Sequence, residues 1–229
     1  MNSHHNIPMH EEILLLALDD DKGTIPMGSM FANAMGGAIL AELVMNKAIA
    51  VGDDKHRKVT ILAPALTGDS ILDECLQKIR DEKKAKKASD WVMKFASLKD
   101  LKNRTARSLV AKGILSESQD KVLGLFKRTI FPEATSGPEE QLRQRLHQVI
   151  FSDSNDPDAR TVVVIALTNA SQMLSGLFDK KELKERKDRI KQLSSGEIVG
   201  QATKEAVEAI QMAIILTTII VPVVITSTN

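Results

Sequence analysis

Apolar residues recur three or four positions apart along most of the chain, which predicts a mainly helical fold. Polar and charged residues fill the positions between them, as expected where one face of a helix packs on a core and the other face meets water. The segments with this pattern are His10–Leu18, 31–49, 71–79, Ser89–Phe95, 98–110, Glu139–Phe151, Asp158–Leu177 and Lys180–Leu193.

The segment Asp158–Leu177 differs from the others because it is apolar nearly all round. A helix with this composition is expected in the centre of a core, and the short polar connections beside it favour antiparallel neighbours. Lys180–Lys191 alternates basic and acidic residues, which predicts a solvated helix face with local ion pairs.

Two stretches rich in β-branched and aliphatic residues predict small β-hairpins. Val51–Asp54 and Lys58–Leu62 flank a polar turn, and Val122–Phe131 ends at a proline. We therefore expect a mostly α fold, with a single compact helical domain over residues 1–229 around a central apolar helix. Small β-hairpins decorate this domain, and residues 1–8 are expected to be flexible.

Local signals refine the expected helices. Ser70 and Asp73 have the spacing of a capping box. Gly36 and Gly37 predict close backbone packing or a break, because glycine costs about 1 kcal/mol relative to alanine inside a helix. Cys75 lies on an apolar stripe, so burial is favoured over a role as a nucleophile.

Composition favours one core and a reducing compartment. The chain has 229 residues, 43% of them apolar, which suffices for a sizeable core in one domain. Its net charge of +1 provides no global field toward nucleic acid or membrane. Its one cysteine cannot form an intrachain disulfide, and the first residues lack the pattern of a secretory signal. We expect a cytoplasmic protein.

Charge is nevertheless unevenly distributed. Lys83–Arg107 carries nine Lys or Arg against two Asp, a local charge of +7 that favours anionic partners. Ala209–Asn229 has no charged side chain. Gln211 and Pro222 interrupt this run, so a buried final helix with a short extended tail is favoured over a membrane span, which needs about 20 apolar residues.

The sequence contains no assembled catalytic or metal-binding motif. Its five histidines show no ligand spacing, and no nucleophile elbow or phosphate-binding loop is present. Glu11 and Glu12 are adjacent, so they point in different directions on a helix and are expected on a solvated face. We therefore expect a protein that is not an enzyme, with no catalytic residue, metal or cofactor.

Several blocks together resemble the Golgi phosphoprotein 3 family, and they extend over most of the chain in order and spacing. They are EEILLLAL, GGAILAEL, TGDSILDECL, LVAKGIL and QLRQRL. The resemblance implies a mainly helical, peripheral membrane protein of vesicle trafficking that docks on the cytosolic face of the Golgi through phosphatidylinositol 4-phosphate. It also implies binding to the cytosolic tails of membrane proteins.

The resemblance also locates a lipid site, which is only partly retained. The site of the family combines a tryptophan and an arginine with two basic residues three positions apart. This sequence has Met27 in place of the tryptophan and Gly36 in place of the arginine. The two basic residues are retained as Lys99 and Lys102. Lys99 and Lys102 are the expected lipid-binding residues, and their spacing predicts one shared helix face. Lysine binds phosphate as a point charge, which predicts weaker headgroup specificity than arginine gives.

Three interpretations of function remain open at this point. The leading one is an adaptor on an anionic phosphoinositide membrane surface, with Val122–Phe131 as an exposed apolar hairpin for self-association or membrane contact. The alternative is a protein-interaction or structural module that has lost specific phosphoinositide binding. Binding to nucleic acid is disfavoured, because the net charge is near neutral and no binding motif is present.

Overall fold

The structure of the chain is a computed structural model that describes residues 7–19, 23–25, 30–52, 57–62, 66–122, 126–135, 137–154 and 156–195. Helices dominate these residues, beside two small antiparallel strand pairs, and confirm the predicted mostly α fold. The helices are α1 (Met9–Ala17), α2 (Phe31–Met45), α3 (Ser70–Arg80), α4 (Ala88–Ala96), α5 (Leu101–Ala111), α6 (Gly137–Phe151), α7 (Ala159–Ala170), α8 (Leu174–Leu177), α9 (Lys180–Glu185) and α10 (Lys187–Ser195). The strands are β1 (Ile49–Val51), β2 (Val59–Ile61), β3 (Ser118–Val122) and β4 (Phe126–Ile130).

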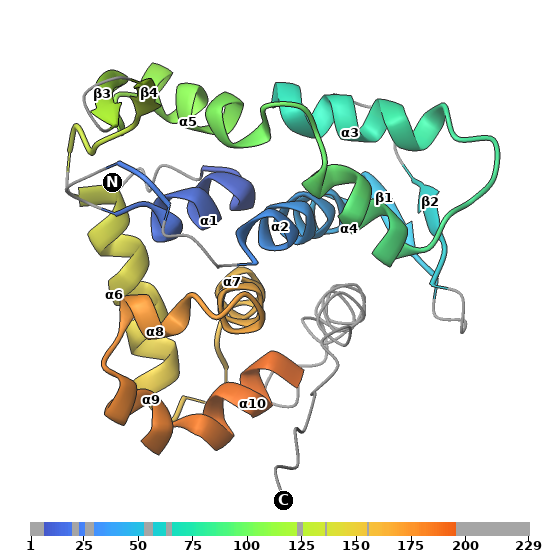
Figure 1. The fold of residues 1–229 in the computed structure, drawn as a ribbon. Coiled ribbons are helices and arrows are strands. Elements are labelled where there is room, and N and C mark those ends of the chain that lie inside the picture. Colours follow the sequence, from blue (N-terminus) through green and yellow to red (C-terminus); the bar gives the residue numbers. More distant parts are fainter. Residues whose placement is uncertain are drawn as a thin grey trace, which may run out of the picture.

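Helices α1, α2 and α7 occupy the centre of the fold (Figure 1). Every residue of α1 is buried, as are residues 34–43 of α2 and residues 161–168 of α7. Figure 1 places α3 and α5 on one side of this centre and α6 with α8, α9 and α10 on the other. The predicted central helix is confirmed in α7, which shares the centre with two others.

Two of the predicted helices are each divided in two. α7 ends before Gln172, whose left-handed backbone (φ 61°) turns the chain into α8. α9 and α10 are separated at Arg186, which donates to the Asp153 carboxylate at 2.8 Å and to the Phe151 carbonyl at 2.9 Å. The prediction of local ion pairs in Lys180–Lys191 is therefore wrong for this arginine, which instead binds the end of α6.

The N-terminus of α3 is capped one residue earlier than the sequence predicts. The Asp69 carboxylate accepts hydrogen bonds from the backbone N–H groups of Ile71 and Leu72, both at 2.9 Å. Asp73 does not complete a capping box with Ser70, because its carboxylate accepts from the backbone N–H of Thr67 at 2.6 Å. An aspartate at the cap satisfies two backbone donors that a helix leaves unpaired, while Asp73 fixes the preceding loop.

Both predicted hairpins form, but with other bounds than predicted. β1 begins before the predicted Val51–Asp54 and includes Ile49, which was expected in a helix, and the second hairpin differs as well. It pairs β3 with β4, so it includes a polar first strand that lies outside Val122–Phe131. Phe131 follows β4 and is fully buried, so the prediction of an exposed Phe131 is wrong. Leu125 and the side chains of Val122 and Phe126 lie outside the described residues, and the predicted role of the hairpin in self-association or membrane contact remains a prediction.

Glu12 and Glu42 anchor the central helices through one arginine. Glu12 is 4% exposed and accepts hydrogen bonds from Arg145 of α6 at 3.0 Å and from Arg160 of α7 at 3.1 Å. Arg160 also binds Glu42 of α2 at 3.1 Å, and Glu42 accepts from the backbone N–H of Met9 at 2.7 Å. A buried carboxylate is tolerated only when it is paired in this way. These contacts connect α1 to α2, α6 and α7.

Glu11 makes a second buried contact, from α1 to α5. It is 0% exposed, and its carboxylate accepts hydrogen bonds from the Lys112 ammonium at 2.5 and 2.6 Å and from the Ser108 hydroxyl at 2.6 Å. The prediction that Glu11 and Glu12 lie on a solvated face is therefore wrong. Their different directions on α1 do hold, and they bring the two carboxylates to different partner helices.

The expected final helix and tail within Ala209–Asn229 lie outside the described residues. None of the helices in the described part of the chain combines the length and the apolar character needed to cross a bilayer.

Gly36 lies where α2 packs against α4. A Cβ atom built on Gly36 would meet the Val92 carbonyl oxygen at 2.3 Å and the Ala96 backbone nitrogen at 2.9 Å. α2 continues through Gly36 and Gly37 without a break. Of the two alternatives for the glycine pair, close backbone packing is therefore confirmed.

We predict that Gly36→Ala lowers the free energy of unfolding by about 1–3 kcal/mol, even though alanine favours helix formation. The added methyl group meets backbone atoms of α4, which cannot rotate away as a side chain does. Gly176→Ala is the matched control, because a Cβ there has no atom within 4 Å. Urea unfolding of both variants measures the effect, and equal stability of the two would contradict it.

Candidate functional site

Much of the positive charge of Lys83–Arg107 is neutralised in the folded chain. Glu82 binds Lys94 at 2.7 Å and Lys86 at 3.5 Å, and Glu74 binds Arg104 at 2.6 Å. Both glutamates belong to sequence outside this stretch and reach it from α3 and the turn that follows. The local charge of +7 therefore overstates the field at this surface.

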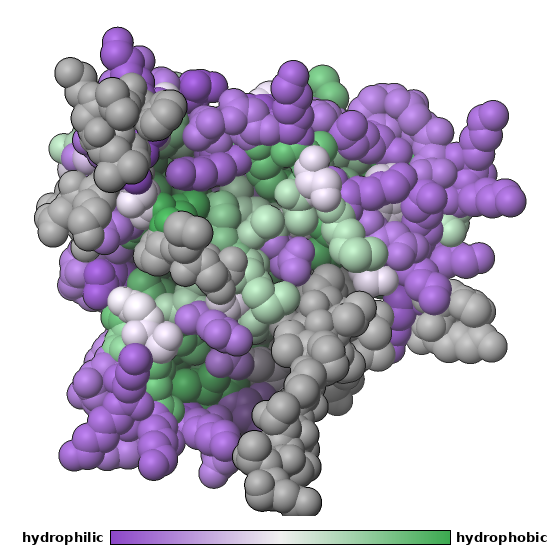
Figure 2. Space-filling view, viewed as in Figure 1, coloured by the Kyte–Doolittle hydropathy of each residue, from purple (hydrophilic) through white to green (hydrophobic). Residues whose placement is uncertain are grey.

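Lys99 and Lys102 remain without an acidic partner among the described residues. Lys99 is exposed and lines a groove of about 540 Å³ beside α3 and α4, together with Lys78, Lys83 and Lys94. Glu74, Asp81 and Glu82 line the same groove, so its charges are mixed. Figure 2 shows hydrophilic side chains along the edge that α3 and α5 form.

The two lysines do not lie on one helix face, so that prediction is wrong. α5 begins at Leu101, and Lys99 lies in the turn before it, where Asp100 has a left-handed backbone (φ 57°). Lys102 lies within α5 and is half-buried; burial, and then repulsion by Arg128 of β4, lower the pKa of its ammonium group. The spacing rule holds only inside a continuous helix.

Lys99 and Lys83 offer exposed ammonium groups at the groove. Lys102 does not line the groove and lies close to Arg128, which is paired with Asp120 at 2.8 Å. An anion beside Lys102 offsets the repulsion that lowers its pKa. Lys83 and Arg128 were not singled out from the sequence, because their proximity to the predicted pair depends on how α3 and β4 pack.

Of the two remaining positions of the predicted lipid site, the structure describes Gly36 and not Met27. Met27 lies outside the described residues. Gly36 faces the backbone of α4 with no room for a side chain, so in this packing an arginine at that position has no place.

One group with metal-ligand chemistry occurs among the described residues, formed by His10, Glu11 and Asp69. The His10 Nε2 atom lies 3.8 Å from an Asp69 carboxylate oxygen, and neither ring nitrogen of His10 has a hydrogen-bond partner. The positive charge that a metal would bring is already supplied to Glu11 by Lys112. This arrangement therefore favours a structural role.

Cys75 is fully buried, which confirms the preferred prediction. Desolvation, followed by the nearby Glu74 carboxylate, raises the pKa of its thiol well above the ordinary value. A thiol of this kind is not ionised near neutral pH and cannot act as a nucleophile.

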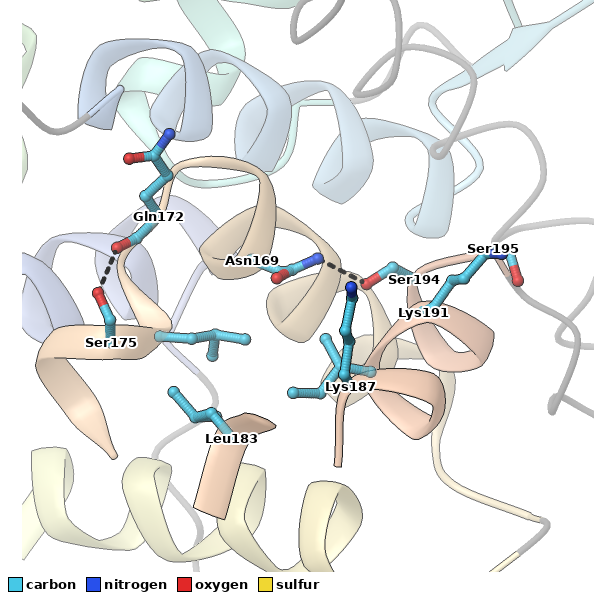
Figure 3. A pocket seen from close by; sticks show the side chains of 10 residues that line it. Asn169, Gln172, Ser175, Leu183, Lys187, Lys191, Ser194 and Ser195 are labelled. Carbon is cyan, nitrogen blue, oxygen red and sulfur yellow. Dashed lines mark hydrogen bonds between the residues drawn. The ribbon is translucent and has the colours of Figure 1, made fainter. Parts of the chain in front are cut away.

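A second cavity, of about 680 Å³, lies among α7, α8, α9 and α10 (Figure 3). Its apolar residues are Leu174, Leu183 and Ile190. Lys187 and Lys191 of α10 line it as well, and Figure 3 shows the Lys187 side chain extending across it toward α7. Nothing in the sequence pattern indicates this cavity, because it forms among helices that the pattern predicts as two continuous segments.

The comparison with known families agrees with the fold. The family model described as Golgi phosphoprotein 3 (GPP34) matches residues 9–210, which is most of the chain. The chain belongs to this family, and the predicted resemblance is confirmed.

The environment of His10 generates a pH prediction. Burial lowers the pKa of the His10 imidazole from 6.5 to about 4, against the opposing influence of Asp69 and Glu42 and with the repulsion of Lys112 and Arg160. Unfolded chains therefore take up a proton at His10 below about pH 6.5, whereas the folded chain does so only near pH 4. The contribution of the neutral His10 side chain to the free energy of unfolding is therefore fully present above pH 6.5 and is lost as the pH falls toward 4.

We predict that His10 removes about 2 kcal/mol from the free energy of unfolding between about pH 7.5 and about pH 5. Burial raises the pKa of Glu11, which acts in the opposite direction, so the comparison requires a variant that keeps Glu11. His10→Leu serves this purpose. The free energy of unfolding of this variant should depend less on pH, because the contribution of His10 is absent. Urea unfolding at both pH values measures it, and identical slopes would show that His10 does not titrate in this way.

Proposed function

We propose that this member of the Golgi phosphoprotein 3 family is a peripheral membrane adaptor that docks on anionic lipid through Lys99 and Lys102. The proposed lipid is phosphatidylinositol 4-phosphate, and the proposed place is the cytosolic face of the Golgi. The observation that carries the proposal is that both lysines have no acidic partner among the described residues, whereas most neighbouring cations do.

Electrostatics supports reversible docking at this edge. A lysine close to an anionic membrane surface contributes about 1 kcal/mol. Lys83 and Lys84 are exposed in the turn between α3 and α4 and add to the contribution of Lys99 and Lys102. Several such lysines together hold a protein on a membrane without a spanning helix, and the attraction weakens as salt increases.

Headgroup discrimination is expected to be weak. A lysine ammonium acts as a point charge, whereas an arginine binds two phosphate oxygens at once. Gly36 leaves no side chain at the position where the family has an arginine. The proposed adaptor therefore responds to phosphate charge more than to the pattern of phosphates on the ring.

The adaptor role includes protein partners and no chemistry of its own. The proposed partners are the cytosolic tails of membrane proteins and, through Val122–Phe131, a second copy of this chain. Turnover of a substrate is not proposed, because in the described part of the chain no group of residues unites a nucleophile, a base and an orienting residue.

A second candidate is a protein-interaction module that has lost specific lipid binding. Gly36 favours it, because its packing against α4 removes one charge from the lipid site of the family. The two candidates differ in vesicle binding, which only the adaptor requires.

We predict that Lys99→Glu with Lys102→Glu weakens binding to phosphatidylinositol 4-phosphate vesicles by at least about tenfold at low salt. Thermal unfolding should change little, because neither lysine has an acidic partner in the described chain, so the substitutions break no ion pair. Co-sedimentation with neutral, phosphatidylserine and phosphatidylinositol 4-phosphate vesicles at two salt concentrations measures the effect.

The matched control is Lys180→Glu with Lys181→Glu, an equal charge change on exposed lysines of α9, at the opposite side of the fold (Figure 1). This variant should bind vesicles nearly as the unchanged protein does. Undiminished binding of the folded Lys99 and Lys102 variant would reject the site. Absence of vesicle binding by the unchanged protein would favour the interaction module.

A further inference from the structure

The cavity among α7, α8, α9 and α10 has the size and lining of a small-molecule site. Its volume of about 680 Å³ falls within the range of about 300–1,000 Å³ that is typical of ligand pockets. A docked protein needs about 800 Å² of surface on each partner, which a cavity of this size does not offer. The cavity is separate from the lysines proposed to contact the membrane, since none of its lining residues lines the groove at Lys99.

The apolar part of the lining selects an aliphatic ligand. Leu174 and Ile190 are buried, and Leu183 is half-buried between them and solvent. Among the described residues, no aromatic side chain lines the cavity, so a nucleobase or other flat ring finds no stacking partner there. Leucine and isoleucine pack well against a flexible hydrocarbon chain, and its burial is favourable in proportion to its length.

The polar part of the lining selects a negative charge at one end of that ligand. Lys187 and Lys191 are four residues apart in α10 and therefore lie on one helix face. Neither forms an ion pair with an acidic residue in the described chain, and no acidic side chain described there lines the cavity. The other polar groups are neutral: Asn169 donates to the Ser194 hydroxyl at 3.4 Å, and the Ser175 hydroxyl donates to the Gln172 carbonyl at 3.2 Å.

We propose that this cavity binds a single-chain anionic amphiphile, with its hydrocarbon chain against Leu174, Leu183 and Ile190 and its acidic head at Lys187 and Lys191. A fatty acid and a lipid with one acyl chain and a phosphate head share this chemistry. Figure 3 shows both parts of the site together: Leu183 enters the cavity from α9 and Lys187 from α10. This cavity lies on the side of the fold opposite α3 and α5, away from the lysines proposed to contact a membrane.

The test uses saturated fatty acids below their micelle-forming concentrations and measures their displacement of a dansyl-labelled fatty acid from the full chain. Affinity should increase about fourfold for each added methylene until the chain fills the cavity. Lys187→Glu with Lys191→Glu should weaken dodecanoate binding at least about tenfold and dodecanol binding much less, because only the acid carries a charge. Lysophosphatidic acid of equal chain length distinguishes a phosphate head from a carboxylate.

Two control variants separate this site from other effects. Lys180→Glu with Lys181→Glu makes the same charge change on α9 outside the cavity and should keep dodecanoate binding unchanged. Lys99→Glu with Lys102→Glu should also keep it, so loss of vesicle binding and loss of fatty-acid binding can be told apart. Absence of saturable binding by the unchanged protein, an affinity independent of chain length, or an equal loss in the Lys180 and Lys181 variant would each overturn the proposal.

Discussion

The fold depends on three buried carboxylates that need cationic partners. Glu11 and Glu12 of α1 and Glu42 of α2 have lost most of their hydration, so each is stable only beside a lysine or arginine from another helix. Arg160 of α7 joins two of them, and Lys112 after α5 neutralises the third. Glu12 keeps Arg145 when Arg160 is removed, whereas removing Lys112 leaves Glu11 as a buried charge without a cation, which costs about 3–5 kcal/mol. This requirement fixes α1 among α2, α5, α6 and α7.

The placement of α1 also determines what surrounds it. His10 is buried beside Asp69, so the cap of α3 and the centre of the fold share one polar cluster. On the other side of α2, Gly36 allows the backbone of α4 to approach closely. The central helices are thus held by polar contacts on one side and by close backbone packing on the other, and the amphipathic helices cover them with their apolar faces.

The packing of the helices also determines the distribution of charge on the surface and the position of the cavities. α3 and the turn after it bring Glu74 and Glu82 against the basic stretch and leave Lys99 as an exposed charge beside them. At the other side of the fold, the break at Arg186 separates α9 from α10 and opens a cavity beneath α7. The folded surface thus decides which cations of the basic stretch have no acidic partner in the described chain.

The sequence by itself determined the helical class, the buried α7 and the family, because each follows from residue spacing or from ordered sequence blocks. Tertiary structure decided the rest. Glu11 and Glu12 lie 101 and 148 residues from Lys112 and Arg160, so no local pattern could distinguish a solvated carboxylate from a buried, paired one. Helix breaks at Asp100 and Gln172 depend on left-handed backbone that these residue types tolerate without requiring it. Which charged groups pair, and where a groove or cavity forms, depends on contacts between segments that are distant in the sequence.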